Sequence, residues 1–132
     1  MIGGLILILF PFLFALAKAD GDVYVKENKR VSHPANAAQL IIIAATLAGL
    51  SKFHVVIYDN WEILEIFLAE LFIYWNCFDV LYNKLQFPER PAFELGTTAK
   101  LDILQRRFWP LFLIKLALLP ASLFVLMQFV IR

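Results

Sequence analysis

Five polar side chains fall on one face of a segment that is otherwise apolar. The segment runs from Trp61 to Leu85 and is rich in Leu, Ile, Phe and Tyr. Residues advance by about 100° around a helix, so one face carries Glu62, Glu65, Asn76, Asp79 and Asn83. Carboxyl and amide groups on such a face either hydrogen-bond to neighbouring helices or line a water-filled path for protons or ions. We favour the helix-joining interpretation and keep the conducting path as the alternative.

Lys115 is the expected partner of one of these carboxyl groups. The segment that carries Asp79 and the last apolar segment are expected to cross the membrane in opposite directions. Asp79 then lies about six residues, or ~9 Å, from one membrane surface, and Lys115 lies about seven residues, or ~10 Å, from the same surface. Charged groups inside a membrane usually pair with one another. We therefore predict an Asp79–Lys115 ion pair, with Asn76 and Asn83 as hydrogen-bonding neighbours.

Glu70 lies near the middle of the same segment but points away from the polar face. No basic residue is expected at its depth, and an ionised carboxylate at the bilayer centre costs at least ~2.5–3.5 kcal/mol. We expect Glu70 either to be protonated or to meet another subunit. It also belongs to the conducting alternative, in which protons or ions pass along Glu65, Glu70, Asn76 and Asp79.

A metal-dependent membrane enzyme is a third alternative, because Glu62 and Glu65 place two carboxyl groups on one helical face and His54 lies nearby in the chain. Carboxylate-bridged metal bundles use Glu-x-x-His pairs, and the sequence has none. The other histidine, His33, is expected on the opposite side of the membrane. Nucleophile motifs, phosphate loops and dinucleotide fingerprints are also absent from the sequence. We predict no catalytic residue, no metal site and no cofactor.

The composition explains where such polar groups would lie. Of the 132 residues, 61% are hydrophobic and only 17% are charged, whereas a soluble domain is about half apolar and roughly a quarter charged. The net charge of +1 and the lack of a basic tract argue against nucleic acid binding. Cys77 is the only cysteine, so an intrachain disulfide is impossible. We predict an integral membrane protein that forms a single domain over residues 1–132 in the lipid bilayer.

The hydrophobic pattern predicts an all-α polytopic transmembrane bundle with about four spans, because a span needs about 20 apolar residues. The predicted spans are residues 2–17, 37–57, 61–85 and 108–131. A short amphipathic helix, capped by Thr97 or Thr98, should lie in the membrane interface before the last span. Residues 21–31 are expected to form a hairpin or an interfacial turn. The first span resembles a signal sequence near Ala17, but it lacks a positive amino-terminal region, so we expect a retained helix.

Orientation follows from the distribution of Lys and Arg, which collect in cytoplasmic loops. Nine of them flank the predicted spans on one side: Lys18, Lys26, Lys29, Arg30, Lys84, Arg90, Lys100, Arg106 and Arg107. Only Lys52 and Arg132 lie on the other side. Both long loops should therefore be cytoplasmic and both termini outside, in a bacterial inner membrane or a virion membrane. Tyr58, Trp61 and Trp109 are expected at the membrane–water interfaces.

One stretch also resembles sequences of known type. The segment Phe78–Asn83 (FDVLYN), followed by Leu95–Asp102 (LGTTAKLD), is similar to a pattern in uncharacterised small membrane proteins of Bacteroidetes-type bacteria and their phages or prophages. The resemblance covers about a third of the chain and carries no catalytic or binding residue. It implies a mobile-element or viral context, such as a holin-like factor or a virion-membrane component.

These observations together favour a protein without enzymatic activity that acts by assembly. We expect a homo-oligomer or a small accessory or structural subunit of a larger membrane complex. The one-sided polar face, the short first span and the absence of catalytic motifs motivate this expectation.

Overall fold

Five helices make up most of the part of the chain that the structure describes. The structure is a computed structural model, and it describes residues 2–28, 33–53, 55–91 and 100–131. The helices are α1 (Ile2–Asn28), α2 (His33–Ser51), α3 (Asn60–Gln86), α4 (Lys100–Arg107) and α5 (Trp109–Ile131). None of the described residues forms a strand. The predicted all-α class is therefore confirmed.

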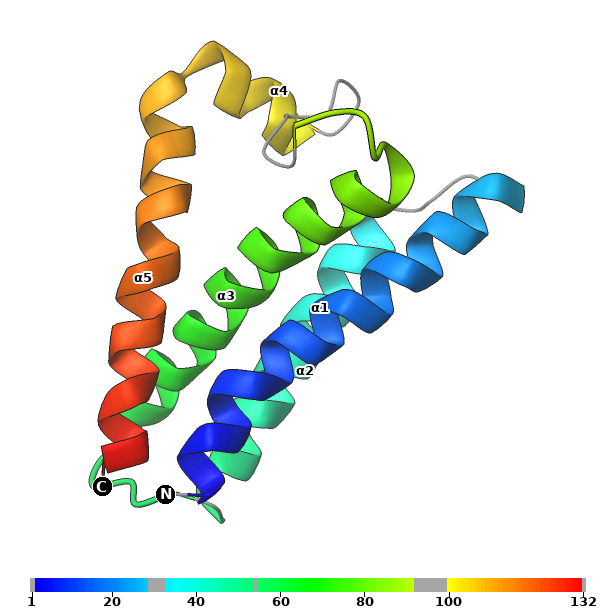
Figure 1. Cartoon of the computed structure of the whole chain (residues 1–132). Coiled ribbons are helices and arrows are strands. Elements are labelled where there is room, and N and C mark those ends of the chain that lie inside the picture. The colour runs from blue at the N-terminus through cyan, green and yellow to red at the C-terminus, as the bar shows by residue number, and fades with distance from the viewer. Residues whose placement is uncertain (1, 29–32, 54, 92–99, 132) are drawn as a thin grey trace.

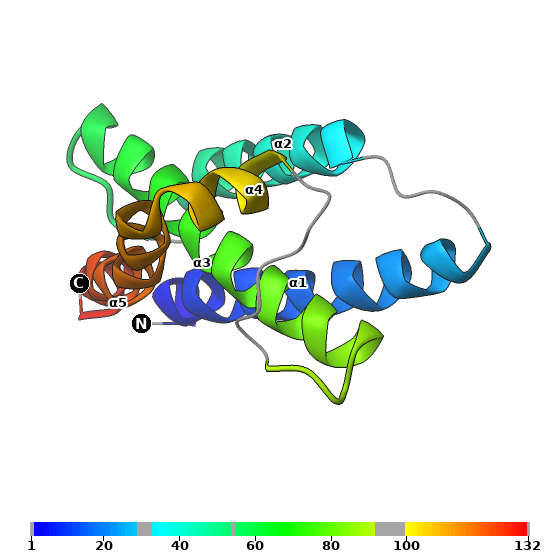
Figure 2. The same ribbon diagram turned by 90° about the horizontal axis from the view of Figure 1, so that it is seen from above.

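Successive long helices run in alternating directions. In Figure 1, α1 rises from the N-terminus, α2 descends, α3 rises and α5 descends to the C-terminus. The short helix α4 crosses the end of the bundle where α3 finishes, and it contacts α5 but no other described helix. In Figure 2, α3 crosses α1, and α3 contacts both α1 and α2. Both termini therefore lie at one end of the bundle, opposite α4.

Helix α3 occupies the centre of the bundle, because it contacts α1, α2 and α5. Its Ile66 and Ile73 are fully buried, and Ala69 lies between them on the same face. Spacings of three, four and seven residues give one helical stripe. Around this stripe gather Leu7 of α1, Ala48 of α2, and Leu126 and Phe129 of α5. The core is therefore a single apolar cluster that all four long helices share.

Small residues allow the helices to approach closely. Ala15 and Ala19 of α1 are completely buried, and Ala44 and Ala48 of α2 are each only 2% exposed. The closest approach is at Gly4, where a Cβ atom would lie 2.5 Å from the Val130 Cα and 2.7 Å from the Phe129 carbonyl oxygen. Small residues at helix contacts are a common device of membrane bundles. Gly4 thus sets the spacing between α1 and α5.

Two predicted boundaries are wrong. Helix α1 continues past Ala17 to Asn28, so residues 21–28, predicted as a hairpin or a turn, are helical. The hydrophobic run marks only the apolar part of the helix, and the helix continues into polar residues. Helix α2 ends at Ser51 instead of residue 57. The apolar residues after it, Val55 and Ile57, lie in a non-helical connection and pack against the core. They are apolar because they are partly buried, and they do not belong to a helix. Thr97 and Thr98 lie outside the described residues.

Among the described residues, two stretches are long and apolar enough to cross a membrane. They are Gly3–Gly21 of α1 and Trp109–Ile131 of α5. The apolar part of α2, Ala37–Ser51, is shorter. Helix α3 is long, but it contains Glu62, Glu65, Glu70, Asp79 and Lys84. By length and apolarity the structure therefore supports two of the four predicted spans.

Candidate functional site

The polar face of α3 does not act as one continuous stripe. Its five members separate into three environments along the helix. Glu62 is buried at the start of α3, Glu65 is exposed, and Asn76, Asp79 and Asn83 lie toward the other end. The side of α3 that meets the core carries Ile66, Ile73 and Glu70 instead. The predicted face therefore borders the core, and only part of it meets another helix.

The strongest polar contact joins α3 to α5. Lys115 of α5 is 4% exposed, and its Nζ forms an ion pair with Oδ2 of Asp79, whose side chain is 31% exposed. The same Nζ lies 4.7 Å from the centre of the Trp75 ring, a distance typical of cation–π contacts. The structure thus brings together the two residues that the depth argument paired. One side of the pair is buried in protein and the other reaches the surface.

Asn76 holds the backbone of α5 beside this pair. Its Nδ2 donates hydrogen bonds to the carbonyl oxygen of Phe72, at 3.0 Å, and to that of Lys115, at 3.1 Å. Asn76 is 3% exposed, so both bonds are shielded from water. Asn83, predicted as a second neighbour of the ion pair, is half-buried near the end of α3. Its backbone carbonyl accepts a hydrogen bond from the Phe87 N–H.

Glu62 caps its own helix. The N-cap residue of α3 is Asp59, and its Oδ1 accepts hydrogen bonds from the N–H groups of Trp61, at 2.8 Å, and Glu62, at 3.1 Å. The Glu62 Oε2 in turn accepts from the Tyr58 N–H at 2.7 Å. An acidic N-cap followed three residues later by Glu is a recognised helix-start pattern. That pattern is present in the sequence at Asp59, and our sequence analysis missed it.

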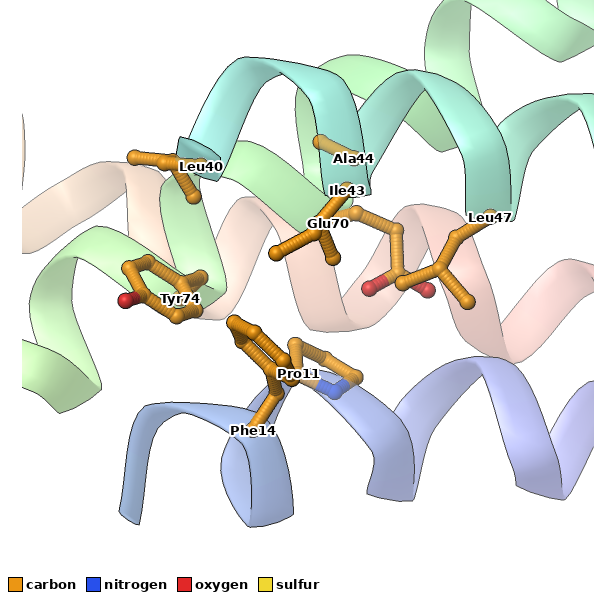
Figure 3. A pocket seen from close by; sticks show the side chains of 8 residues that line it. All are labelled: Pro11, Phe14, Leu40, Ile43, Ala44, Leu47, Glu70 and Tyr74. Atoms are coloured by element: carbon orange, nitrogen blue, oxygen red, sulfur yellow. The ribbon is translucent and has the colours of Figure 1, made fainter. Parts of the chain in front are cut away.

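Glu70 occupies the other polar position of α3, inside the bundle. It is 1% exposed, and neither carboxyl oxygen has a hydrogen-bond partner among the described residues. A small cavity of about 10 Å³ lies beside it. The other lining residues are Pro11, Phe14, Leu40, Ile43, Ala44, Leu47 and Tyr74, from α1, α2 and α3. Side chains of its own chain surround the Glu70 carboxyl group (Figure 3), and the two expectations for it, protonation or contact with another subunit, both stay predictions.

Neither carboxyl group proposed for a metal site has metal-binding surroundings. Glu62 is committed to the cap of α3, and Glu65 points outward. His54 lies outside the described residues. Within the described ranges, no group of three or more His, Cys, Asp and Glu side chains could hold a metal ion.

No family model, no curated protein and no solved structure matches the chain.

Proposed function

We propose that this chain is an integral membrane protein without enzymatic activity that acts by assembly, as a homo-oligomer or as a small subunit of a larger complex. The observation that carries the proposal is the direction in which its apolar residues point. Only 28% of the apolar stretch of α1 and 22% of that of α5 is buried. The core helix of a soluble protein hides most of its apolar residues. Here Leu13, Ile42 and Phe124, from three helices, are 64%, 63% and 69% exposed.

Four spans explain the length and packing of the helices better than two. Helix α3 has 27 residues, or about 40 Å, and it lies between α1, α2 and α5. A central helix cannot leave the membrane while its three neighbours remain in it. The 19 residues of α2 extend about 28 Å, close to the ~30 Å of a hydrocarbon core. The polar groups of α3 are compatible with this placement, because Asp79 pairs with Lys115 and Asn76 bonds to the backbone.

Aromatic and basic residues support one orientation. Tyr58 and Trp61, at the start of α3, and Trp109, at the start of α5, are all more than half exposed. The two helices start at opposite ends of the bundle (Figure 1), so the rings fit the two interfacial belts of a membrane. The basic residues Lys84, Arg90, Arg106 and Arg107 belong to the end where α4 lies, whereas Lys52 belongs to the other. The end with α4 is then cytoplasmic, and both termini are outside.

Assembly is the proposed mode of action because the polar side chains of this fold join and cap helices. The ion pair and Asn76 tie α5 to α3, and Glu62 fixes the start of α3. Such a protein offers other proteins its outer helix surfaces. The resemblance around Phe78–Asn83 supports a phage-related version, with a holin-like or virion-membrane role.

The test is the native mass of the full chain in nanodiscs, with every co-purifying protein identified. A homo-oligomer of defined stoichiometry, or a defined complex with other membrane proteins, is the expected result. A monomer without partners would overturn the assembly proposal, and recovery in the soluble fraction would overturn the membrane placement. The holin-like version predicts membrane damage on overexpression, and normal host growth at high expression would remove it.

A further inference from the structure

The Glu70 carboxyl group lies where an apolar bundle has no structural need for one. It takes part in none of the contacts that hold α5 or cap α3, and in the part of the chain that the structure describes neither of its oxygens has a hydrogen-bond partner. Burying a charge without a partner costs far more than burying the neutral acid, so such groups usually take up a proton. A buried polar group that neither joins nor caps helices indicates a binding site for a ligand.

The cavity beside Glu70 restricts what that ligand can be. Its volume of about 10 Å³ is close to the minimum that holds one water molecule. The walls from α1 and α2 carry no titratable side chain, and α3 adds only Tyr74. Figure 3 shows the Tyr74 hydroxyl on the far side of its ring from the Glu70 carboxyl group. A metal cation would need several oxygen ligands, which these apolar walls do not supply. A proton needs only the carboxyl group.

Pro11 adds a hydrogen-bond acceptor to this region. It lies within α1 and in the cavity wall, and it has no N–H to donate to the carbonyl group of Leu7, four residues earlier. A water molecule or a protonated carboxyl group can donate to such a carbonyl group. The Leu7 carbonyl group, one turn before the lining residue Pro11, therefore has unused capacity to accept a hydrogen bond.

We propose that Glu70 and its cavity form an intramembrane proton-binding site, in which the carboxyl group carries one proton and hydrogen-bonds to one water molecule. The site opens between α1 and α2, which of all the touching helix pairs among the described residues have the least contact. Its lining residues Phe14, Leu40, Ile43 and Leu47 are only half-buried. Only these side chains separate the Glu70 carboxyl group from the lipid, and an apolar reagent must displace them to reach it. This inference rests on the membrane placement proposed above.

The test uses an apolar reagent that modifies protonated carboxyl groups, N,N′-dicyclohexylcarbodiimide. The acid O–H adds across one C=N bond, so that the proton goes to nitrogen and the carboxyl oxygen bonds to carbon. The acyl group then moves to nitrogen, which leaves a stable adduct with the full mass of the reagent. Full-length protein in nanodiscs is labelled at several pH values, and the modified residue is located by peptide mass spectrometry. We expect one adduct at Glu70, with a rate that falls as the pH rises.

Two variants and a second measurement complete the experiment. Glu70→Gln should abolish the adduct, whereas Glu65→Gln, on the same helix but exposed, should leave it unchanged. The infrared band of a protonated carboxyl group should be present in the wild type and absent from Glu70→Gln. Ala44→Leu, which fills the cavity, should slow the exchange of this band in D2O. Locating the adduct on the wild-type protein needs no variant, so this measurement remains decisive if a variant fails to fold.

The results separate this inference from the assembly proposal. If the protein is embedded in nanodiscs but Glu70 is unlabelled and the protonated band is missing, the proton site is wrong and the assembly proposal stands. If Glu70 is labelled in a protein that is monomeric in nanodiscs, the proton site stands and the assembly proposal is wrong.

Discussion

The side-chain amide of Asn76 donates a hydrogen bond to the backbone carbonyl oxygen of Lys115, the residue whose ammonium group pairs with Asp79. One turn of α3 thus binds both the backbone and the side chain of a single residue of α5. In a bundle where helices share an apolar surface with lipid, hydrogen bonds between helices and close packing supply much of the association energy. This contact therefore determines where α5 meets α3.

Replacing Asn76 should loosen this contact. Asn76→Leu keeps the approximate size of the side chain but removes both hydrogen bonds, and we expect a loss of about 1 kcal/mol in the free energy of unfolding. Gln128→Leu is the matched control, because Gln128 is polar but exposed on α5. Chemical denaturation in mixed micelles measures both. Equal stabilities for the two variants would mean that the Asn76 amide contributes nothing to the α3–α5 contact.

The two halves of the ion pair should respond unequally to mutation. Asp79→Asn leaves the ammonium group of Lys115, 4% exposed, without a counter-charge, and this should cost about 3 kcal/mol. Lys115→Met leaves the Asp79 carboxyl group without its cation, but a carboxyl group can become neutral by taking up a proton, so the loss should be smaller. The double variant should recover part of the loss of Asp79→Asn. A double-mutant cycle in mixed micelles measures the coupling, and additive effects would argue against a working ion pair.

Replacing Gly4 or Gly49 by alanine should change the free energy of unfolding in opposite directions. Gly4→Ala forces a Cβ atom against the backbone of Val130, 2.5 Å away, and overpacking of this kind costs about 1–3 kcal/mol. Apart from the nearby backbone of α2 itself, no atom of the described residues lies within 4 Å of a Cβ at Gly49. Gly49→Ala should therefore stabilise the protein by roughly 0.5–1 kcal/mol, because alanine favours the helix. Unfolding midpoints of the two variants that move in the same direction would contradict the packing of α1 against α5.

The cap of α3 gives a test of what Glu62 does. Asp59→Ala should cost about 1 kcal/mol, the usual value for a lost N-cap, and Glu62→Ala should also destabilise, because the Tyr58 N–H loses its acceptor. Glu65→Ala, one turn further along α3 and exposed, should leave the unfolding free energy unchanged within about 0.5 kcal/mol. If Glu65→Ala destabilises as much as Glu62→Ala, then the two carboxyl groups act together, as the metal-site interpretation requires.

The proposed orientation is tested by cysteine accessibility in intact cells. Cys77→Ala removes the only native cysteine, and single cysteines are then placed at Asn60 or at Glu89. Both residues are exposed, Asn60 at the start of α3 and Glu89 in the turn after its end. A membrane-impermeant maleimide added outside should label the Asn60→Cys variant, and the Glu89→Cys variant should react only after lysis. The reverse pattern would invert the topology, and labelling of both from outside would remove α3 as a span.

The sequence alone was enough for the helical class, the approximate position of the four long helices and the short helix before α5. Long apolar runs predict the four long helices, and the spacing of apolar residues predicts the short amphipathic one. The contact between Asp79 and Lys115 could also be predicted by counting residues along two antiparallel helices, because the rise per residue of a helix is constant. The cap at Asp59 was equally readable, from the acidic residue three positions before Glu62.

Only the tertiary structure decided how each helix is turned about its own axis. The same periodicity that placed Glu62, Glu65 and Asn76 on one face of α3 did not reveal that this face borders the core, or that Glu70 points into it. Rotation depends on which neighbours pack against the helix, and Gly4, Ala44 and Leu126 belong to segments far away in the chain. Spacing along one helix carries no information about those neighbours. Local pattern therefore determined the helices, and packing between distant segments determined how they are turned toward one another.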